Sequence, residues 1–266
     1  NAGKVKAAVA GRYRLRFGMG LVMNTDFTFG KAASLLSLTR TTNSLRPHSS
    51  RMEANYLQGV GATVALSRHA ELTSFFSHRL VDATLNSDSS TVKTLLKTSY
   101  HRTRSEMERR RNTRQTTGGA SLVLRSGPWR VALSGVATTF NRRLLPDTSV
   151  VYRRYSAVGK SFINGSLSYS YSSPLLRVAG ETAIGSTGGL AALHSVGISP
   201  SSRLDVSLVH RYYSYRYRSL FAAGFSDGGA INNEHGLLVS VAWRPTDVLA
   251  LSAYADYARS EWPRYM

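Results

Sequence analysis

The residues closest to a catalytic motif are Gly224-Phe225-Ser226-Asp227-Gly228, which match the Gly-x-Ser-x-Gly pattern of hydrolase nucleophiles. His210, Asp227 and His235 lie close enough in sequence to complete a Ser-His-Asp arrangement, in which a histidine would take the proton of Ser226. That pattern requires a helix directly after the serine, and the glycine- and asparagine-rich residues that follow are typical of a loop. We therefore expect no catalytic residues, and a hydrolase is only the remote alternative.

Metal and cofactor chemistry has little support in the sequence. The chain has no cysteine, which excludes disulfides, thiolate metal ligands and cysteine nucleophiles. Its seven histidines show no metal-ligand spacing with carboxylates. We expect neither a metal nor a cofactor.

The second chemical feature is a large excess of arginine. The 34 basic residues outnumber the 15 acidic ones, which gives a formal charge of +19. Such a field favours polyanions, and nucleic acid, lipid head groups, lipopolysaccharide phosphates and an acidic partner all remain open. Part of the excess lies in two long polar connections, at Arg109, Arg110, Arg111 and Arg114 and at Arg142, Arg143, Arg153 and Arg154. These arginines form either a solvated surface or a contact for an anionic partner.

Arginine also alternates with tyrosine over residues 211–218. Such a surface could stack nucleic-acid bases and bind phosphates, as single-strand binders do. We favour an interfacial role, because tyrosines at a strand end are typical of the aromatic girdle of a membrane barrel.

The elements that position these residues follow from a period-two alternation. Residues 162–172 place Ile163, Leu167 and Tyr169 on one face and serines on the other. One apolar and one polar face on segments of about ten residues predicts a transmembrane β-strand. The mean hydropathy of -0.19 is compatible with this, because a barrel needs only every second residue to be apolar. A soluble β-sandwich or barrel alternates as well and is the alternative fold.

The pattern predicts an all-β fold, a transmembrane antiparallel up-and-down β-barrel with roughly 12–14 strands. The expected strands cover residues 11–19, 20–29, 55–67, 71–82, 91–104, 118–126, 129–140, 161–172, 174–184, 189–198, 202–214, 235–243 and 248–258. Residues 30–54, 105–117 and 141–160 are expected loops. Three expected strands separate the turns near residues 68–70 and 126–128, although turns on one side require an even number. Either one strand assignment is therefore wrong, or residues 30–54 lie on the short-turn side.

The charged residues within the expected strands share the face opposite the apolar ones. Arg177, Glu181, Asp205 and Arg211 are the lumen-facing candidates. Opposite charges on adjacent strands would pair, and could plug a small barrel instead of leaving a channel. The expected lipid-facing residues are Leu176, Val178, Leu204, Val206, Leu237, Val239 and Val241.

Several stretches of the chain resemble a known family. They are Arg16-Phe17-Gly18-Met19-Gly20-Leu21-Val22-Met23-Asn24-Thr25-Asp26-Phe27, Tyr100-His101-Arg102-Thr103, Gly180-Glu181-Thr182-Ala183-Ile184, the segment from His210 to Tyr217, and Asn233-Glu234-His235-Gly236. Together they are similar to outer-membrane β-barrel proteins of Bacteroidota known as helix-hairpin-helix domain-containing proteins. The resemblance covers about residues 11–265 and implies a barrel with DNA-binding helix-hairpin-helix modules upstream of it. It implies no catalytic residues.

These observations lead to one interpretation with open alternatives. We expect residues 1–266 to form a single barrel domain in a bacterial outer membrane, with further chain beyond residue 266 and the upstream modules absent. The expected partners are outer-membrane lipid, lipopolysaccharide and other outer-membrane proteins, with nucleic acid reached only through the absent modules. The expected role is a structural subunit of an outer-membrane complex or a passage for anionic solutes, and DNA binding or uptake is the alternative.

Overall fold

Most of this chain forms one sheet, along whose strands buried and exposed side chains alternate. The computed structural model describes residues 4–26, 38–49, 56–97 and 100–264. The other residues lie outside the described part. They include Phe27, parts of the expected strands 20–29, 55–67 and 91–104, and part of the expected loop 30–54. The described residues form a 14-stranded sheet in which all pairings but one are antiparallel. The predicted all-β up-and-down fold is confirmed.

Eleven long strands form the wall, each paired with the next along the path. They are β1 (Val5–Arg16), β3 (Leu57–Ala65), β4 (Ala70–Val81), β7 (Thr113–Ser126), β8 (Trp129–Leu144), β9 (Gly159–Ser172), β10 (Leu176–Gly185), β11 (Leu190–Ser201), β12 (Leu204–Tyr213), β13 (Glu234–Trp243) and β14 (Leu251–Arg259). The path runs from β1 to β14, and no pairing joins these two strands within the described residues.

Short elements lie outside this succession. They are β2 (Ser44–Pro47), which pairs with the end of β1; β5 (Ala83–Leu85) and β6 (Thr91–Leu95), which pair with each other; the helix α2 (Arg104–Glu108); and the 3-10 helix η2 (Val151–Arg153). β6 also pairs in parallel with the end of β8. No helix among the described residues is long and apolar enough to cross a membrane.

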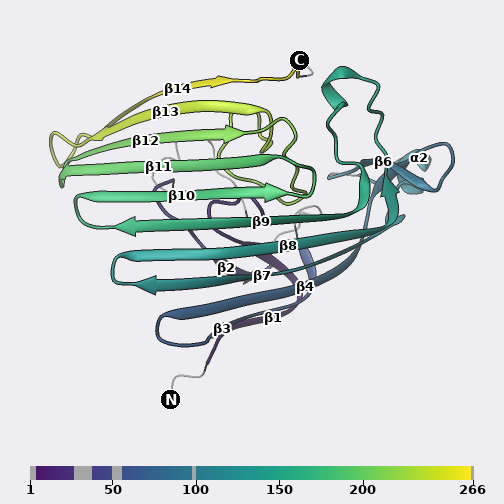
Figure 1. Ribbon diagram of the computed structural model, residues 1–266, viewed down its shortest axis with the longest axis horizontal. Helices are drawn as coiled ribbons and strands as arrows, with labels where there is room; N and C mark the ends of the chain where they lie inside the picture. Colours follow the sequence, from purple (N-terminus) through teal and green to yellow (C-terminus); the bar gives the residue numbers. More distant parts are fainter. Residues whose placement is uncertain (1–3, 27–37, 50–55, 98–99, 265–266) are drawn as a thin grey trace.

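The connections differ at the two ends of the wall. Figure 1 shows tight turns at the left, between β3 and β4, β7 and β8, and β9 and β10, whereas β6 and α2 belong to a long connection at the right. The long connections between β1 and β3, between β8 and β9 and between β12 and β13 share that right-hand end. We call the two ends the tight-turn end and the long-loop end. Such asymmetry is typical of outer-membrane barrels.

The structure corrects three strand and loop assignments. The expected strand 91–104 is wrong, since only Thr91–Leu95 is a strand and it belongs to a connection. Two wall strands, β4 and β7, therefore separate the two tight turns, which resolves the parity conflict. The expected loop 105–117 instead contains most of α2 and the start of β7. Residues 20–26 are not a wall strand, because they turn inward after β1.

The outer face of the wall is apolar and exposed. In β8 the exposed Leu133 lies between the buried Ala132 and Ser134, and this alternation continues along the strand. Leu133 is 63% exposed and pairs with Leu167 of β9, which is 52% exposed. A soluble domain rarely leaves such a band of large apolar side chains in water, whereas a lipid-facing wall requires one.

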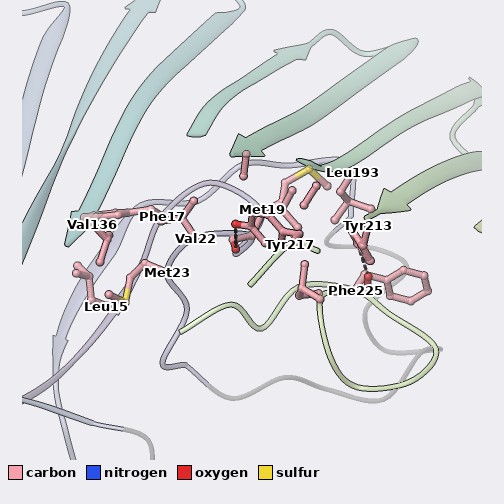
Figure 2. Packing of buried hydrophobic residues seen from close by; sticks show 14 of the residues in the cluster. Leu15, Phe17, Met19, Val22, Met23, Val136, Leu193, Tyr213, Tyr217 and Phe225 are labelled. Carbon is pink, nitrogen blue, oxygen red and sulfur yellow. Dashed lines mark hydrogen bonds between the residues drawn. The ribbon is translucent and has the colours of Figure 1, made fainter. Parts of the chain in front are cut away.

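The inner face carries the hydrophobic core. Residues that follow β1 pack against side chains of β8, β11 and β12, as Figure 2 shows for Phe17, Met19, Val22 and Met23 beside Val136, Leu193 and Tyr213. The segment closes on itself because the backbone N–H of Phe17 donates to the carbonyl of Met23 at 2.9 Å. The interior of the wall is thus occupied by the chain's own connections.

Candidate functional site

The inner segment of residues 17–25 is fastened to the wall by a buried carboxylate. Glu181 of β10 is fully buried and accepts hydrogen bonds from the backbone N–H groups of Met19, at 2.6 Å, and Leu21, at 3.2 Å. Two backbone donors directed at one carboxylate oxygen offset part of the cost of burying its charge. Gly18 is required beside it, because a Cβ atom there would lie 2.8 Å from that oxygen and its φ is +57°.

A second inner segment, residues 214–233 between β12 and β13, covers the first one. The backbone N–H of Asn24 donates to the carbonyl of Phe221 at 2.9 Å, and that of Ala223 donates to Gly20 at 3.0 Å. Tyr217, also fully buried, donates its hydroxyl to the carbonyl of Leu21 at 2.9 Å. Burial raises the pKa of the Tyr217 hydroxyl, so it remains a protonated donor. The two inner segments therefore form one hydrogen-bonded unit, which we call the plug.

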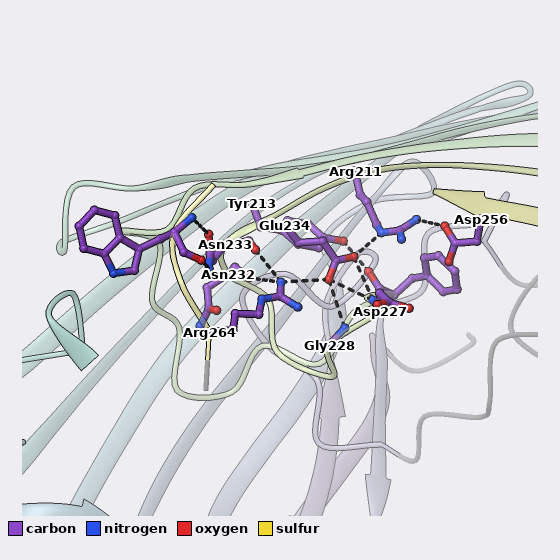
Figure 3. A network of polar contacts seen from close by, with 11 residues as sticks. Arg211, Tyr213, Asp227, Gly228, Asn232, Asn233, Glu234, Asp256 and Arg264 are labelled. Carbon is purple, nitrogen blue, oxygen red and sulfur yellow. Dashed lines mark hydrogen bonds and ion pairs between the residues drawn. The ribbon is translucent and has the colours of Figure 1, made fainter. Parts of the chain in front are cut away.

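Buried charges fasten the second segment to the wall. Glu234, at the start of β13, accepts hydrogen bonds from the backbone N–H groups of Asp227, at 2.9 Å, and Gly228, at 3.2 Å (Figure 3). The same carboxylate pairs with Arg211 of β12, whose guanidinium also contacts Asp256 of β14 at 2.8 Å. Arg211 and Glu234 are almost completely buried. Removal of either side chain would therefore leave the other buried charge without this partner, which strongly destabilises a fold.

Another pair of opposite charges, Arg177 and Asp205, lies nearer the tight-turn end. Arg177 of β10 donates to Asp205 of β12 at 2.7 Å, and Ser199 donates to the same Asp205 oxygen at 2.5 Å. A cavity of about 370 Å³ borders this pair and reaches Ser240 and Tyr254. Both charged side chains remain partly accessible.

The structure places all four lumen-facing candidates on the inner face, yet it does not bring them into one row. Glu181 binds the first inner segment, Arg211 belongs to the Glu234 network, and Arg177 is paired with Asp205. Each of these four side chains faces a carboxylate, a guanidinium or backbone donors. Within the described wall, none of them is therefore an unpaired charge that could line an open path.

The eight arginines of the basic clusters all lie at the long-loop end. Arg109, Arg110 and Arg111 follow α2, Arg114 is the second residue of β7, Arg142 and Arg143 directly precede the last residue of β8, and Arg153 and Arg154 lie in or directly after η2. Most of them are exposed, and none forms an ion pair within the described part of the chain. Arg142 instead donates to the carbonyls of Asn112, at 3.3 Å, and Ser89. We call these eight residues the basic rim.

The nucleophile-elbow pattern does not become a catalytic triad among the described residues. Ser226 lies in the second inner segment, outside any helix or strand, directly after Phe225, whose ring is buried in the core. His210 and His235 lie on the opposite, outer face of the wall, where their Nε2 atoms are 3.1 Å apart. The strands β12 and β13 therefore separate both imidazoles from the serine.

Residues 211–218, in which arginine alternates with tyrosine, form neither a continuous nucleic-acid surface nor a continuous aromatic girdle. Tyr213 and Tyr217 are buried and donate to inner-segment carbonyls, and Arg211 is buried with them. Tyr212 faces outward, as a girdle residue would, and Tyr215 stacks with Trp262 at 5.8 Å. Alternation along the segment could not reveal this division, because the chain leaves the wall after Tyr213.

Sequence reasoning considered paired charges that plug the barrel, but it missed the inner segments that form the plug. Its signal is the segment Phe17–Met23, in which apolar residues and two glycines follow one another without the alternation of a wall strand. The glycines at positions 18 and 20 have φ values of +57° and +89°, which turn the chain back toward the lumen.

Comparisons with known proteins add little to this geometry. No protein-family profile and no curated protein matches the chain. Among solved structures it is similar to the "Outer-membrane expressed OmpT of Vibrio cholerae", with a TM-score of 0.36 and 8% sequence identity. That match covers 94% of this chain and 66% of the other, so the chain spans just under two thirds of its length. At this score and identity the comparison carries no argument about activity or partners, and the fold rests on the strand pairing described above.

Proposed function

We propose that this chain is a plugged outer-membrane β-barrel that serves as a non-enzymatic structural subunit of an outer-membrane complex. The observation that supports this most directly is the plug, in which two inner segments bind each other and the buried wall carboxylates Glu181 and Glu234. A pore that conducts solutes requires a continuous polar path, and here the middle of the inner face is a hydrophobic core.

The passage of anionic solutes is the less favoured role for the same reason. Anion selectivity in a pore comes from arginine or lysine side chains that face the permeating ion. Arg177 and Arg211 are each engaged by a carboxylate, and Arg211 is completely buried. We expect the purified protein to show little ionic conductance in planar lipid bilayers. Stable anion-selective currents would contradict the structural role and favour a passage.

The basic rim is the surface through which we propose that the subunit binds an anionic partner. Arginines without carboxylate partners at one end of a wall attract phosphate-bearing lipopolysaccharide or an acidic protein surface. The resemblance to barrels with upstream helix-hairpin-helix modules adds duplex DNA as an outcome to test.

The test replaces Arg109, Arg110 and Arg111 together with serine. We expect a folded barrel that retains less lipopolysaccharide or fewer co-purifying outer-membrane proteins than the wild type. The difference should shrink as salt is raised, because salt screens exposed charges. The matched control replaces Arg68, Arg203 and Arg244 with serine, which removes the same charge at the tight-turn end.

The outcomes separate the candidate roles. Equal loss in both triple variants would mean that only net charge matters, and no loss in either would leave the rim a solvated surface. Retention of duplex DNA by this chain alone, with a steep salt dependence, would favour nucleic-acid capture instead.

A further inference from the structure

A cluster of nitrogen donors lies on the outer face of the wall, where the other large side chains are mostly apolar. His210 of β12 and His235 of β13 contact each other through their Nε2 atoms, 3.1 Å apart. A guanidinium nitrogen of Arg259, in β14, lies 3.5 Å from Nδ1 of His235. Strand register accounts for this grouping, because His235 pairs directly with Tyr212 and with Arg259 on the two neighbouring strands.

The cluster has basic groups but no acidic partner. The adjacent carboxylates of β13 and β14, Glu234 and Asp256, point inward and are engaged by Arg211. Within the described residues Arg259 forms no ion pair, and both Arg259 and His210 are exposed. An arginine on the outer face of a membrane wall is tolerated only near the interface, where its guanidinium reaches head groups or water.

The depth of the cluster indicates which anion is available. Arg259, His235 and Tyr212 are at or next to the long-loop ends of their strands. The next outward row combines His210, Leu237 and Tyr257, and the row below it combines Leu208, Val239 and Ala255. From one row to the next, the side chains change from charged to aromatic to aliphatic. This order matches a path from the head groups into the hydrocarbon layer.

We propose that His210, His235 and Arg259 form a binding site for the phosphate group of an anionic membrane lipid. The guanidinium would make charge-assisted hydrogen bonds to the phosphate oxygens, and the Nδ1–H of His210, which does not face His235, would supply a further donor. Tyr212 packs edge-on against His235 at 6.0 Å and limits access from one side. The site goes beyond the proposed structural role and depends only on the wall lying in a membrane, not on the basic rim or its partner.

Another outward histidine provides a matched control. His194 of β11 lies directly beside His210 in register, on the same face. Its Nδ1 is 3.1 Å from the hydroxyl of Tyr169, and the two rings stack over Gly180, where a Cβ atom would lie 2.3 Å from Nδ1. His194 therefore has a packing role, and its replacement should leave lipid binding unchanged.

The experiment measures lipid retention by the detergent-solubilised protein in native mass spectrometry. The probes are phosphatidic acid and, as the neutral comparison, phosphatidylcholine of the same chain length. We expect the wild type to retain phosphatidic acid preferentially and the double variant His235→Gln/Arg259→Gln to bind it about tenfold to a hundredfold more weakly, as expected for lost hydrogen bonds to a charged group. Arg259→Lys keeps the charge and should retain most of the binding, and His194→Gln should bind like the wild type.

Each alternative result overturns the proposal. Equal retention by the double variant and the wild type would show that these side chains do not bind the lipid. Equal weakening in His194→Gln would mean that any change on this face matters. Displacement of the lipid by inorganic phosphate at matched concentration would identify a soluble-anion site instead. Failure of the basic-rim experiment would leave these measurements unaffected, so the two proposals are tested separately.

Discussion

The carboxylate of Glu181 accepts a hydrogen bond from the backbone N–H of Met19 at 2.6 Å, although 162 residues separate them in the chain. This contact joins a wall strand in the second half of the sheet to the segment that leaves the first strand. Because the same oxygen also accepts from Leu21, one side chain determines where the first inner segment lies.

Replacing Glu181 with alanine should loosen the plug. Two buried backbone N–H groups would lose their acceptor, which costs about 2–4 kcal/mol of unfolding free energy. Urea unfolding in detergent micelles measures the loss, and ionic conductance in bilayers should rise because the inner segment is no longer held. Glu181→Gln keeps one acceptor oxygen and should lose less stability than the alanine variant. If both variants unfold like the wild type, Glu181 does not hold the segment.

The plug also depends on a close approach at Gly189, in the turn between β10 and β11. A Cβ atom there would lie 2.1 Å from the backbone nitrogen of Tyr217. Gly189→Ala should therefore displace the second inner segment and cost about 1–3 kcal/mol, as overpacking does. Gly135→Ala is the control, because nothing lies within 4 Å of its Cβ position. Equal midpoints of thermal unfolding for the two variants would argue against this contact.

Arginine in place of Val178 tests the lipid-facing wall. Val178 pairs with Tyr171 of β9 and Val196 of β11 on the outer face. A guanidinium on the lipid face costs about 2–4 kcal/mol at the middle of the hydrocarbon layer and less toward its edge, where Val178 lies, so Val178→Arg should insert less completely into lipid vesicles than the wild type. Val178→Leu keeps the face apolar and should insert like the wild type. Normal insertion of the arginine variant would place this face away from lipid.

Ser226 should show no nucleophilic reactivity. It lies outside any helix or strand, and both nearby histidines in the sequence are on the other side of the wall. We expect a serine-reactive fluorophosphonate probe to label the wild type and Ser226→Ala equally weakly. Strong labelling that disappears in the variant would reopen the hydrolase alternative.

The helix α2 should fray in acid. Glu106 accepts hydrogen bonds from the backbone N–H groups of Arg102, at 2.7 Å, and Thr103, at 3.2 Å, which lower its pKa below the usual 4.5. The stabilisation is therefore complete above pH 4.5 and is lost as the pH falls through the lowered pKa. The hydrogen-exchange protection factor of the Met107 amide, which donates to Thr103, should decrease over that range. Glu106→Gln should remove the pH dependence.

Much of the wall could be predicted from the sequence. Each wall position faces either lipid or the interior, so side chains alternate in chemistry, as in β8 to β13, and prolines at Pro128 and Pro174 mark tight turns. The same alternation separated Arg177 and Glu181 from the apolar residues of β10. It could not distinguish a wall strand from a strand in a connection, and so the expected strand 91–104 was wrong.

Only the tertiary structure decided what fills the wall. The inner segments lack a period, and their contacts join residues as distant as Leu21 and Tyr217, 196 positions apart. Local pattern carries no information on such pairs, because their energy arises from burial and from hydrogen bonds that form once the wall has brought both segments together. The sequence by itself therefore determined which face of each strand is apolar, and the packing decided that the charges facing inward hold a plug.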